Sequence, residues 1–283
     1  MSKMKAGQRD ATIAACSLSF LMNDWLERRF KLPEAELPDL REDSPKIAAA
    51  TLREQWGLGE RPIKNVIHLL EVKGIRLYSL AQNCVEVDAC SLWRNDQPYM
   101  YLNTFKSAER SRYDAAHELG HLVLHRHGAP TGQNAEQAAN EFAAAFLMPP
   151  GAVRAAGPKI ATLANLVQLK KKWIVSVGAL AHRLNDLDLV SDWHYRMLCI
   201  ELQKRGWRNK EPEEAPRERS QVWEKVFNML RHEKVGRLEL ADALAVPEQE
   251  ISDLVFGLVT ISVSPAQEPL YTTPPRAQLR VIK

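Results

Sequence analysis

The stretch AAHELGHLVLHRHG, residues 115–128, carries four histidines and one glutamate among apolar residues. His117 and His121 are four positions apart, so a helix would place both imidazoles on one face, one turn apart. Two imidazole nitrogens placed in this way can bind one zinc ion at about 2.0–2.1 Å. The other face of the same helix is apolar, which is typical of a helix that packs on a core. The pattern predicts a zinc-binding helix, and the alternative is a helix in which the histidines are coincidental.

Glu118 follows the first expected ligand and completes an HExxH motif. Its carboxylate would lie beside the metal, where a bound water would sit. Zinc can lower the pKa of such a water to roughly 7, and Glu118 could take the proton as hydroxide attacks a peptide carbonyl. This is the arrangement of metalloproteases. His125 and His127, at the end of the helix, are expected to be structural or solvated, because imidazolium suits the end of the helix dipole.

A catalytic zinc usually has three protein ligands, so a third must come from elsewhere in the chain. Glu136 is the best candidate, because Gly128, Pro130 and Gly132 before it would let the next helix fold back on the first. Asn140 lies one turn after Glu136 and could hydrogen-bond the second nitrogen of a ligand histidine. Glu141 is the competing ligand, although it lies on a different face of the helix.

The segments before and after this motif differ in the secondary structure that they predict. Three short β-branched or aromatic segments predict strands, at residues 75–80 (IRLYSL), 84–93 (CVEVDACSLW) and 98–103 (PYMYLN). The segments before and after them have helical periodicity. We expect an α+β fold of the zincin-like type. In it a small, mostly antiparallel three-stranded sheet packs on the HExxH helix, and a helical C-terminal region follows.

The chain divides into three expected segments. Residues 1–43 form an N-terminal helical segment, 44–208 the metallopeptidase domain, and 209–283 a helical C-terminal domain with an extended tail. The boundary at 208 is set by NKEPEEAPRERS, residues 209–220, whose charge and prolines predict a linker.

The composition of the chain limits the partners and the cellular compartment that we expect for it. The net charge of +3 demands no nucleic-acid partner. The start of the chain shows no signal segment, and the most apolar late run, residues 254–263, is too short to span a bilayer. The four cysteines are scattered and are expected to be free thiols in a reducing compartment. The expectation is a cytoplasmic protein without a membrane partner.

Cys90 is the cysteine with the most unusual setting. In a regular strand it would share a face with Glu86 and Asp88, opposite Val85 and Val87, so it is not an obvious core residue. A thiolate is a good zinc ligand. One hypothesis is that Cys90 occupies the fourth position of the metal and keeps the enzyme latent; the alternative is an ordinary strand cysteine.

Other segments carry weaker signals. A second group that steadies the oxyanion is usual in such sites, and Arg183 and Tyr195 are the candidates, with a structural role as the alternative for each. Residues 237–255 predict two helices joined by a short break, as in a helix-turn-helix motif. Their second helix lacks basic residues, which favours a generic helix pair. The basic cluster KKKW, residues 170–173, predicts a solvated face. The alternative is a contact with a phosphate backbone, in which case DNA would be an activating ligand.

The HELGHLVLH run at residues 117–125, followed by EQAANEFAAAFLMP at 136–149, resembles the ImmA/IrrE family of zinc metallopeptidases. The resemblance extends over roughly residues 44–213. It implies zinc held by His117, His121 and Glu136, with Glu118 as general base. A second acidic residue, often present two positions after the third ligand, is Ala138 here, which favours Glu136.

The same resemblance implies a substrate class. Members of the family commonly cleave helix-turn-helix repressors and so release genes of stress responses, mobile elements or antiphage defence. Residues 1–43 are too short for a helix-turn-helix domain of their own, so the repressor is expected to be a separate protein. The alternative function is a catalytically silent sensor or scaffold that relieves repression by binding the repressor or DNA alone.

Overall fold

The computed structural model describes residues 6–80, 89–126, 132–158, 160–207, 210–255 and 257–259. The first helices are α1 (Ala6–Glu27), α2 (Pro45–Gln55) and α3 (Val66–Val72). The strands follow as β1 (Arg76–Ser79), β2 (Ala89–Arg94) and β3 (Gln97–Leu102). The later helices are α4 (Ala108–Leu124), α5 (Gln133–Leu147), α6 (Pro150–Ala156), α7 (Leu163–Trp173), α8 (Val177–Asp186), α9 (Asp192–Lys204), α10 (Gln221–His232), α11 (Arg237–Leu244) and α12 (Glu248–Leu254).

The three strands form one sheet in the order β1-β3-β2. β2 and β3 are antiparallel, while β1 runs parallel to β3. The β2–β3 turn is made by Asn95 and Asp96, whose φ angles are 49° and 59°. Such two-residue hairpin turns need positive φ at both positions, which Asn and Asp tolerate. The expected α+β fold is confirmed, with one strand pair antiparallel and one parallel; residues 84–88 of the second expected strand lie outside the described residues.

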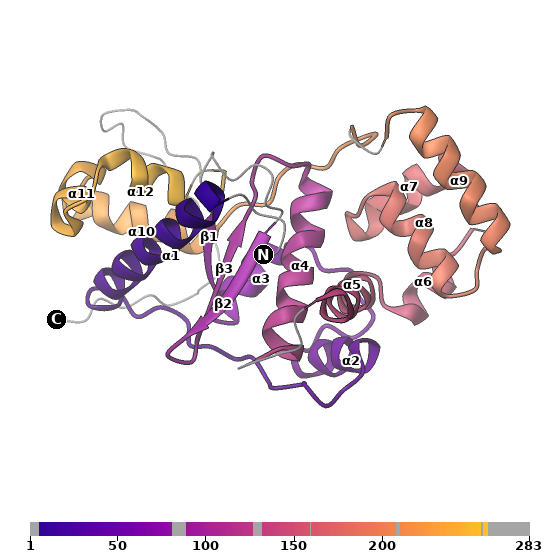
Figure 1. The fold of residues 1–283 in the computed structure, drawn as a ribbon, viewed down its shortest axis with the longest axis horizontal. Helices are drawn as coiled ribbons and strands as arrows, with labels where there is room; N and C mark the ends of the chain where they lie inside the picture. Colours follow the sequence, from indigo (N-terminus) through magenta and orange to yellow (C-terminus); the bar gives the residue numbers. More distant parts are fainter. Residues whose placement is uncertain are drawn as a thin grey trace.

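Both faces of the sheet are covered by helices. Along β3, Met100 and Leu102 contribute to a core shared with α4 and α5, whereas Tyr99 and Tyr101 contribute to a second core shared with α1 and α10–α12. This alternation follows from the two-residue period of a strand. Figure 1 shows α4 lying along one side of the sheet, with α5 and α2 beyond it, and α1 and α10–α12 on the other side.

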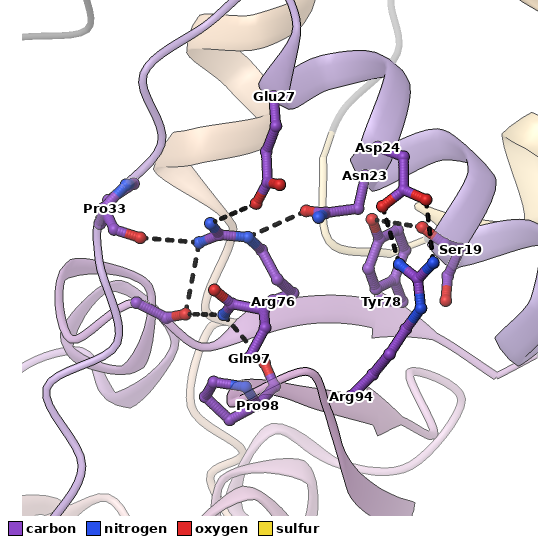
Figure 2. A network of polar contacts seen from close by, with 11 residues as sticks. Ser19, Asn23, Asp24, Glu27, Pro33, Arg76, Tyr78, Arg94, Gln97 and Pro98 are labelled. Carbon is purple, nitrogen blue, oxygen red and sulfur yellow. Dashed lines mark hydrogen bonds and ion pairs between the residues drawn. The ribbon is translucent and has the colours of Figure 1, made fainter.

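Polar contacts fasten α1 to the sheet (Figure 2). Arg76 on β1 forms an ion pair with Glu27 at 2.9 Å and donates to Asn23 at 2.9 Å. Arg94 on β2 pairs with Asp24 through both guanidinium nitrogens, at 2.7 and 2.9 Å. The second core therefore combines residues from all three segments expected from the sequence.

Residues 210–220, which we call the strap, bind the N-termini of three different helices. Glu211 accepts a hydrogen bond from Val177 N of α8 at 2.8 Å, and Glu214 accepts one from Ala108 N of α4 at 3.2 Å. Glu218 accepts from Val66 N of α3 at 2.8 Å. Carboxylates at helix N-termini satisfy orphan N–H groups and complement the helix dipole. The segment predicted as a linker is therefore a bound part of the fold.

The KKKW cluster, predicted as a solvated face, is solvated in part: Lys171 and Lys172 are exposed, whereas Lys170 is not. Lys170 is buried and contacts Glu109 at 2.7 Å and Glu211 at 3.3 Å. Lys171 pairs with Glu213 of the strap at 2.5 Å. The first two lysines are therefore engaged in ion pairs within the chain.

The predicted helix pair near the C-terminus is present as α11 and α12. Ala245, at a φ of 55°, ends α11, and Pro247 precedes α12. The first turn of α12 carries Glu248 and Glu250, so its N-terminus does not present the basic side chains of a DNA-reading helix. Across the described ranges, no helix has the length and apolar character needed to cross a membrane.

Candidate metal centre and active site

Helix α4 supplies the HExxH motif on a rigid element. The side chain of Ser107 caps its N-terminus by accepting from Arg110 N at 3.3 Å. Its apolar face is fully buried and includes Ala115, Ala116, Leu119 and Val123. The side chains of His117 and His121 lie on another face and are 15% and 22% exposed. The helix therefore fixes the two imidazoles while leaving them accessible.

The following helix, α5, packs closely on α4 and brings a carboxylate to these rings. Gly120 makes this approach possible, because a Cβ at this position would lie 3.0 Å from Phe142 and 3.3 Å from Ala139 Cα. In the first turn of α5, Glu136 Oε2 lies 3.2 Å from His117 Nε2, and Glu136 Oε1 lies 3.7 Å from His121 Nε2. The two Nε2 atoms are 3.1 Å apart.

These three residues fit a zinc ion by their chemistry and spacing. Among the described residues, they form the group whose ligand atoms all lie within 4.8 Å of one another. Donors bound at about 2.0–2.1 Å to a tetrahedral ion are about 3.3 Å apart, close to the separations present here. Burial lowers the pKa of His121 to about 4, so this ring is neutral at neutral pH and can donate a lone pair. The competing acid, Glu141, instead accepts from Gln137 on its own helix at 3.0 Å.

Each imidazole also has a partner for its outer nitrogen. Asn140 Oδ1 lies 3.1 Å from His117 Nδ1, the contact expected from its position one turn after Glu136. His125 Nδ1 lies 2.9 Å from His121 Nδ1. Such outer partners fix the tautomer and orientation of a ligand histidine. The sequence predicts only a structural or solvated role for His125 at the helix end, whereas in the structure it contacts a ligand histidine. His127 lies outside the described residues.

Glu118 lies beside the metal donors but is buried, with 7% exposure. Its Oε2 accepts a hydrogen bond from Ser91 Oγ of β2 at 2.6 Å. Burial raises the pKa of Glu118, and the hydrogen bond from Ser91 opposes that shift. A carboxyl with a raised pKa is a better proton acceptor at neutral pH, as a general base requires. Sequence reasoning missed Ser91, because nothing in the chain's local pattern pairs β2 with a particular residue of α4.

Cys90 is the residue next to Ser91, and its side chain packs against the second core, on the α1 side of the sheet. Because neighbouring strand residues point to opposite faces, the thiol is directed away from α4 in this conformation. For Cys90 to bind the metal, β2 would have to turn over. The latency hypothesis stays a prediction that this geometry does not favour.

The two residues predicted to steady an oxyanion have other contacts. Arg183 is buried and donates to the carbonyl of Met148 at 3.0 Å, and it pairs with Asp186 at 2.5 Å. The ring of Tyr195 packs edge-on against His182, with centroids 5.9 Å apart. His182 itself lines the cleft described next, and it is better placed than either to meet a substrate.

An open cleft of about 900 Å³ lies over Glu136. Its walls come from α4, α5 and α8, and include Tyr113, Glu136, Asn140, Glu141, Ser176 and His182. Tyr113 is held in its wall by a hydrogen bond to the carbonyl of Asn140 at 3.1 Å. Of the three donors, Glu136 lines this cleft, so a polypeptide bound in it would lie beside that carboxylate.

An HExxH helix, a third donor from the next helix and a small sheet beside them define a zincin-like metallopeptidase fold. Residues 70–185 match the family model described as the IrrE N-terminal-like domain, Peptidase_M78. Residues 70–185 therefore form a domain of the ImmA/IrrE metallopeptidase type. No protein in the curated set matches the chain.

Proposed function

We propose that the chain is a zinc-dependent endopeptidase that cleaves a helix-turn-helix transcriptional repressor in the cytoplasm. Cleavage would derepress a stress, mobile-element or antiphage defence operon. The observation that carries the enzymatic part is the convergence of His117, His121 and Glu136 beside the buried carboxylate of Glu118. The repressor as substrate is supported by the family resemblance.

The residues of the site divide the chemistry between them. His117, His121 and Glu136 would hold the ion, which when bound polarises a carbonyl and acidifies a water. Glu118 accepts the proton of the attacking water and returns it to the leaving amine. Its burial raises its pKa, which favours both proton transfers. Asn140 and His125 keep the two ligand rings in the required tautomers. The α4–α5–α8 cleft binds the substrate segment.

Glu118→Gln separates this proposal from the silent-scaffold alternative. The variant and the wild type are purified, analysed for zinc, and incubated with the small helix-turn-helix protein encoded nearest to the gene. We expect one zinc per chain in both, and cleavage slowed by about 10²–10⁴-fold in the variant, the usual contribution of a general base. A reporter for the repressor should then stay silent. Derepression by the variant would instead support a binding function, and the exposed Glu233→Gln, at the end of α10, is the matched control.

A further inference from the structure

Ser91 and Trp93 fasten strand β2 to the active-site helix. Ser91 Oγ donates to Glu118 Oε2 at 2.6 Å, and Trp93 Nε1 donates to the carbonyl of Leu122 at 3.2 Å. Two residues along a strand span about 6.6 Å, and four along a helix span about 6 Å. The two contacts therefore match in spacing, so β2 runs along α4 in a defined register.

The surroundings hold Ser91 in this position. It pairs in the sheet with Met100 of β3, which is completely buried. Two residues on, the guanidinium of Arg126 covers the ring of Trp93, 4.0 Å from its centre. The packing of Cys90 on the opposite face excludes the alternative in which the strand presents its other side to α4. The hydroxyl of Ser91 is consequently aimed at Glu118: it lies 2.6 Å from the carboxylate oxygen Oε2 and 3.3 Å from the backbone carbonyl oxygen, and the shorter contact is the one to the carboxylate.

This contact matters because a glutamate side chain has three rotatable bonds and its two carboxylate oxygens are equivalent until something distinguishes them. A hydrogen bond to Oε2 restrains the last torsion and leaves the second oxygen for proton transfer. The same donor offsets part of the cost of keeping the carboxylate ionised while buried.

We propose that Ser91 is a positioning residue for Glu118, holding one carboxylate oxygen so that the other faces the reacting water. The proposal rests on the endopeptidase function proposed above. Ser91 acts through Glu118 and does not hold the metal, so its loss should leave zinc binding and substrate binding largely intact. Misplacing a reacting group by about 1 Å can cost on the order of 100-fold in rate.

The test compares Ser91→Ala, Ser91→Thr and the control Ser79→Ala with the wild type. Ser79 lies on β1, and its hydroxyl contacts Leu80 and Thr104, away from the site. The substrates are fluorescein-labelled casein and any small helix-turn-helix protein that is encoded beside the gene. For Ser91→Ala we expect kcat to fall about 10- to 100-fold with KM within about twofold and zinc content unchanged. Ser91→Thr, which keeps the hydroxyl, should recover most of kcat, and Ser79→Ala should not change it.

A second readout is independent of activity. Crystals of the metal-free chain should show Glu118 bound to residue 91 in the wild type and in Ser91→Thr, but displaced or in several rotamers in Ser91→Ala. An unmoved Glu118 in Ser91→Ala, or a kcat equal to that of the wild type, overturns the positioning role. If the wild type cleaves neither substrate, the proposed function fails, and the metal-free crystals still decide whether Ser91 positions Glu118.

Discussion

The side-chain oxygen of Asn140 lies 3.1 Å from Nδ1 of His117. An amide oxygen can only accept, so this contact requires the proton of His117 on Nδ1 and leaves the lone pair of Nε2 for a metal. Glu136, one turn earlier on α5, reaches the same Nε2 at 3.2 Å. Helix α5 therefore supplies both a ligand and the group that orients another ligand.

Asn140→Ala tests this orienting role. Without the amide, His117 can adopt the wrong tautomer, so we expect zinc affinity to fall about 10- to 100-fold, the usual effect of losing an outer partner. Competition with a chromophoric chelator measures the change. Gln137→Ala is the control on the same helix, since Gln137 contacts Glu141 rather than a donor. Equal affinities in Asn140→Ala and the wild type would show that the amide is dispensable.

The choice of third ligand gives a second prediction. Glu136 reaches both imidazoles, whereas Glu141 is turned toward Gln137. Glu136→Ala should therefore weaken zinc binding by more than about 100-fold, beyond the range for outer partners. Glu141→Ala should retain wild-type zinc content by metal analysis. The reverse result would move the third ligand to Glu141.

The sequence predicted those parts of the site that lie on single helices. His117, Glu118 and His121 follow from one helical spacing, and Glu136 with Asn140 from the next. The contacts that join separate elements could not be predicted in this way. Ser91 reaches Glu118 only because β2 lies against α4 in one register, and no local pattern encodes that register.

The same limit explains the strap and α1. Charge and proline in residues 209–220 are typical of solvated linkers. Glu211, Glu214 and Glu218 become fixed only because three helix N-termini converge on them. Likewise, α1 has the periodicity of an independent helix, and its partners Arg76 and Arg94 lie about 50 or more residues away along the chain.

Glu71 gives stability a pH dependence of predictable sign. Its carboxyl, buried between α3 and α10, accepts from Ser220 Oγ, Gln221 N and Val222 N. Burial raises the pKa of Glu71 from 4.5 to about 7. The folded state therefore holds this proton more tightly than the unfolded state. The resulting stabilisation is complete below about pH 4.5 and is lost as pH rises through 7, a change of about 3 kcal/mol.

Glu71→Gln mimics the protonated side chain and should remove this dependence. Its free energy of unfolding, relative to the wild type, should rise between pH 5 and pH 8. Urea unfolding measures it, with a chelator present so that metal release adds no pH dependence of its own. The exposed Glu233→Gln on the end of α10 is the control. A constant difference between Glu71→Gln and the wild type across this range would contradict the raised pKa.

Of the glutamates in the strap, Glu218 is the one whose replacement should lower the free energy of unfolding most. Its Oε2 accepts from Val66 N and Ile67 N at 2.8 and 3.2 Å, while its Oε1 pairs with Arg112, a buried residue of α4. Glu218→Ala leaves that guanidinium buried without its carboxylate, a change that costs about 3–5 kcal/mol in other proteins. Glu214→Ala removes only an exposed cap at Ala108 and should cost about 1 kcal/mol. Urea unfolding of both variants measures the difference, because the two glutamates lie on the same strap and differ in what they neutralise. Similar small losses in both would mean that the strap contributes little to the stability of α4, whereas a large loss confined to Glu218→Ala ties residues 210–220 to the helix that carries the metal ligands.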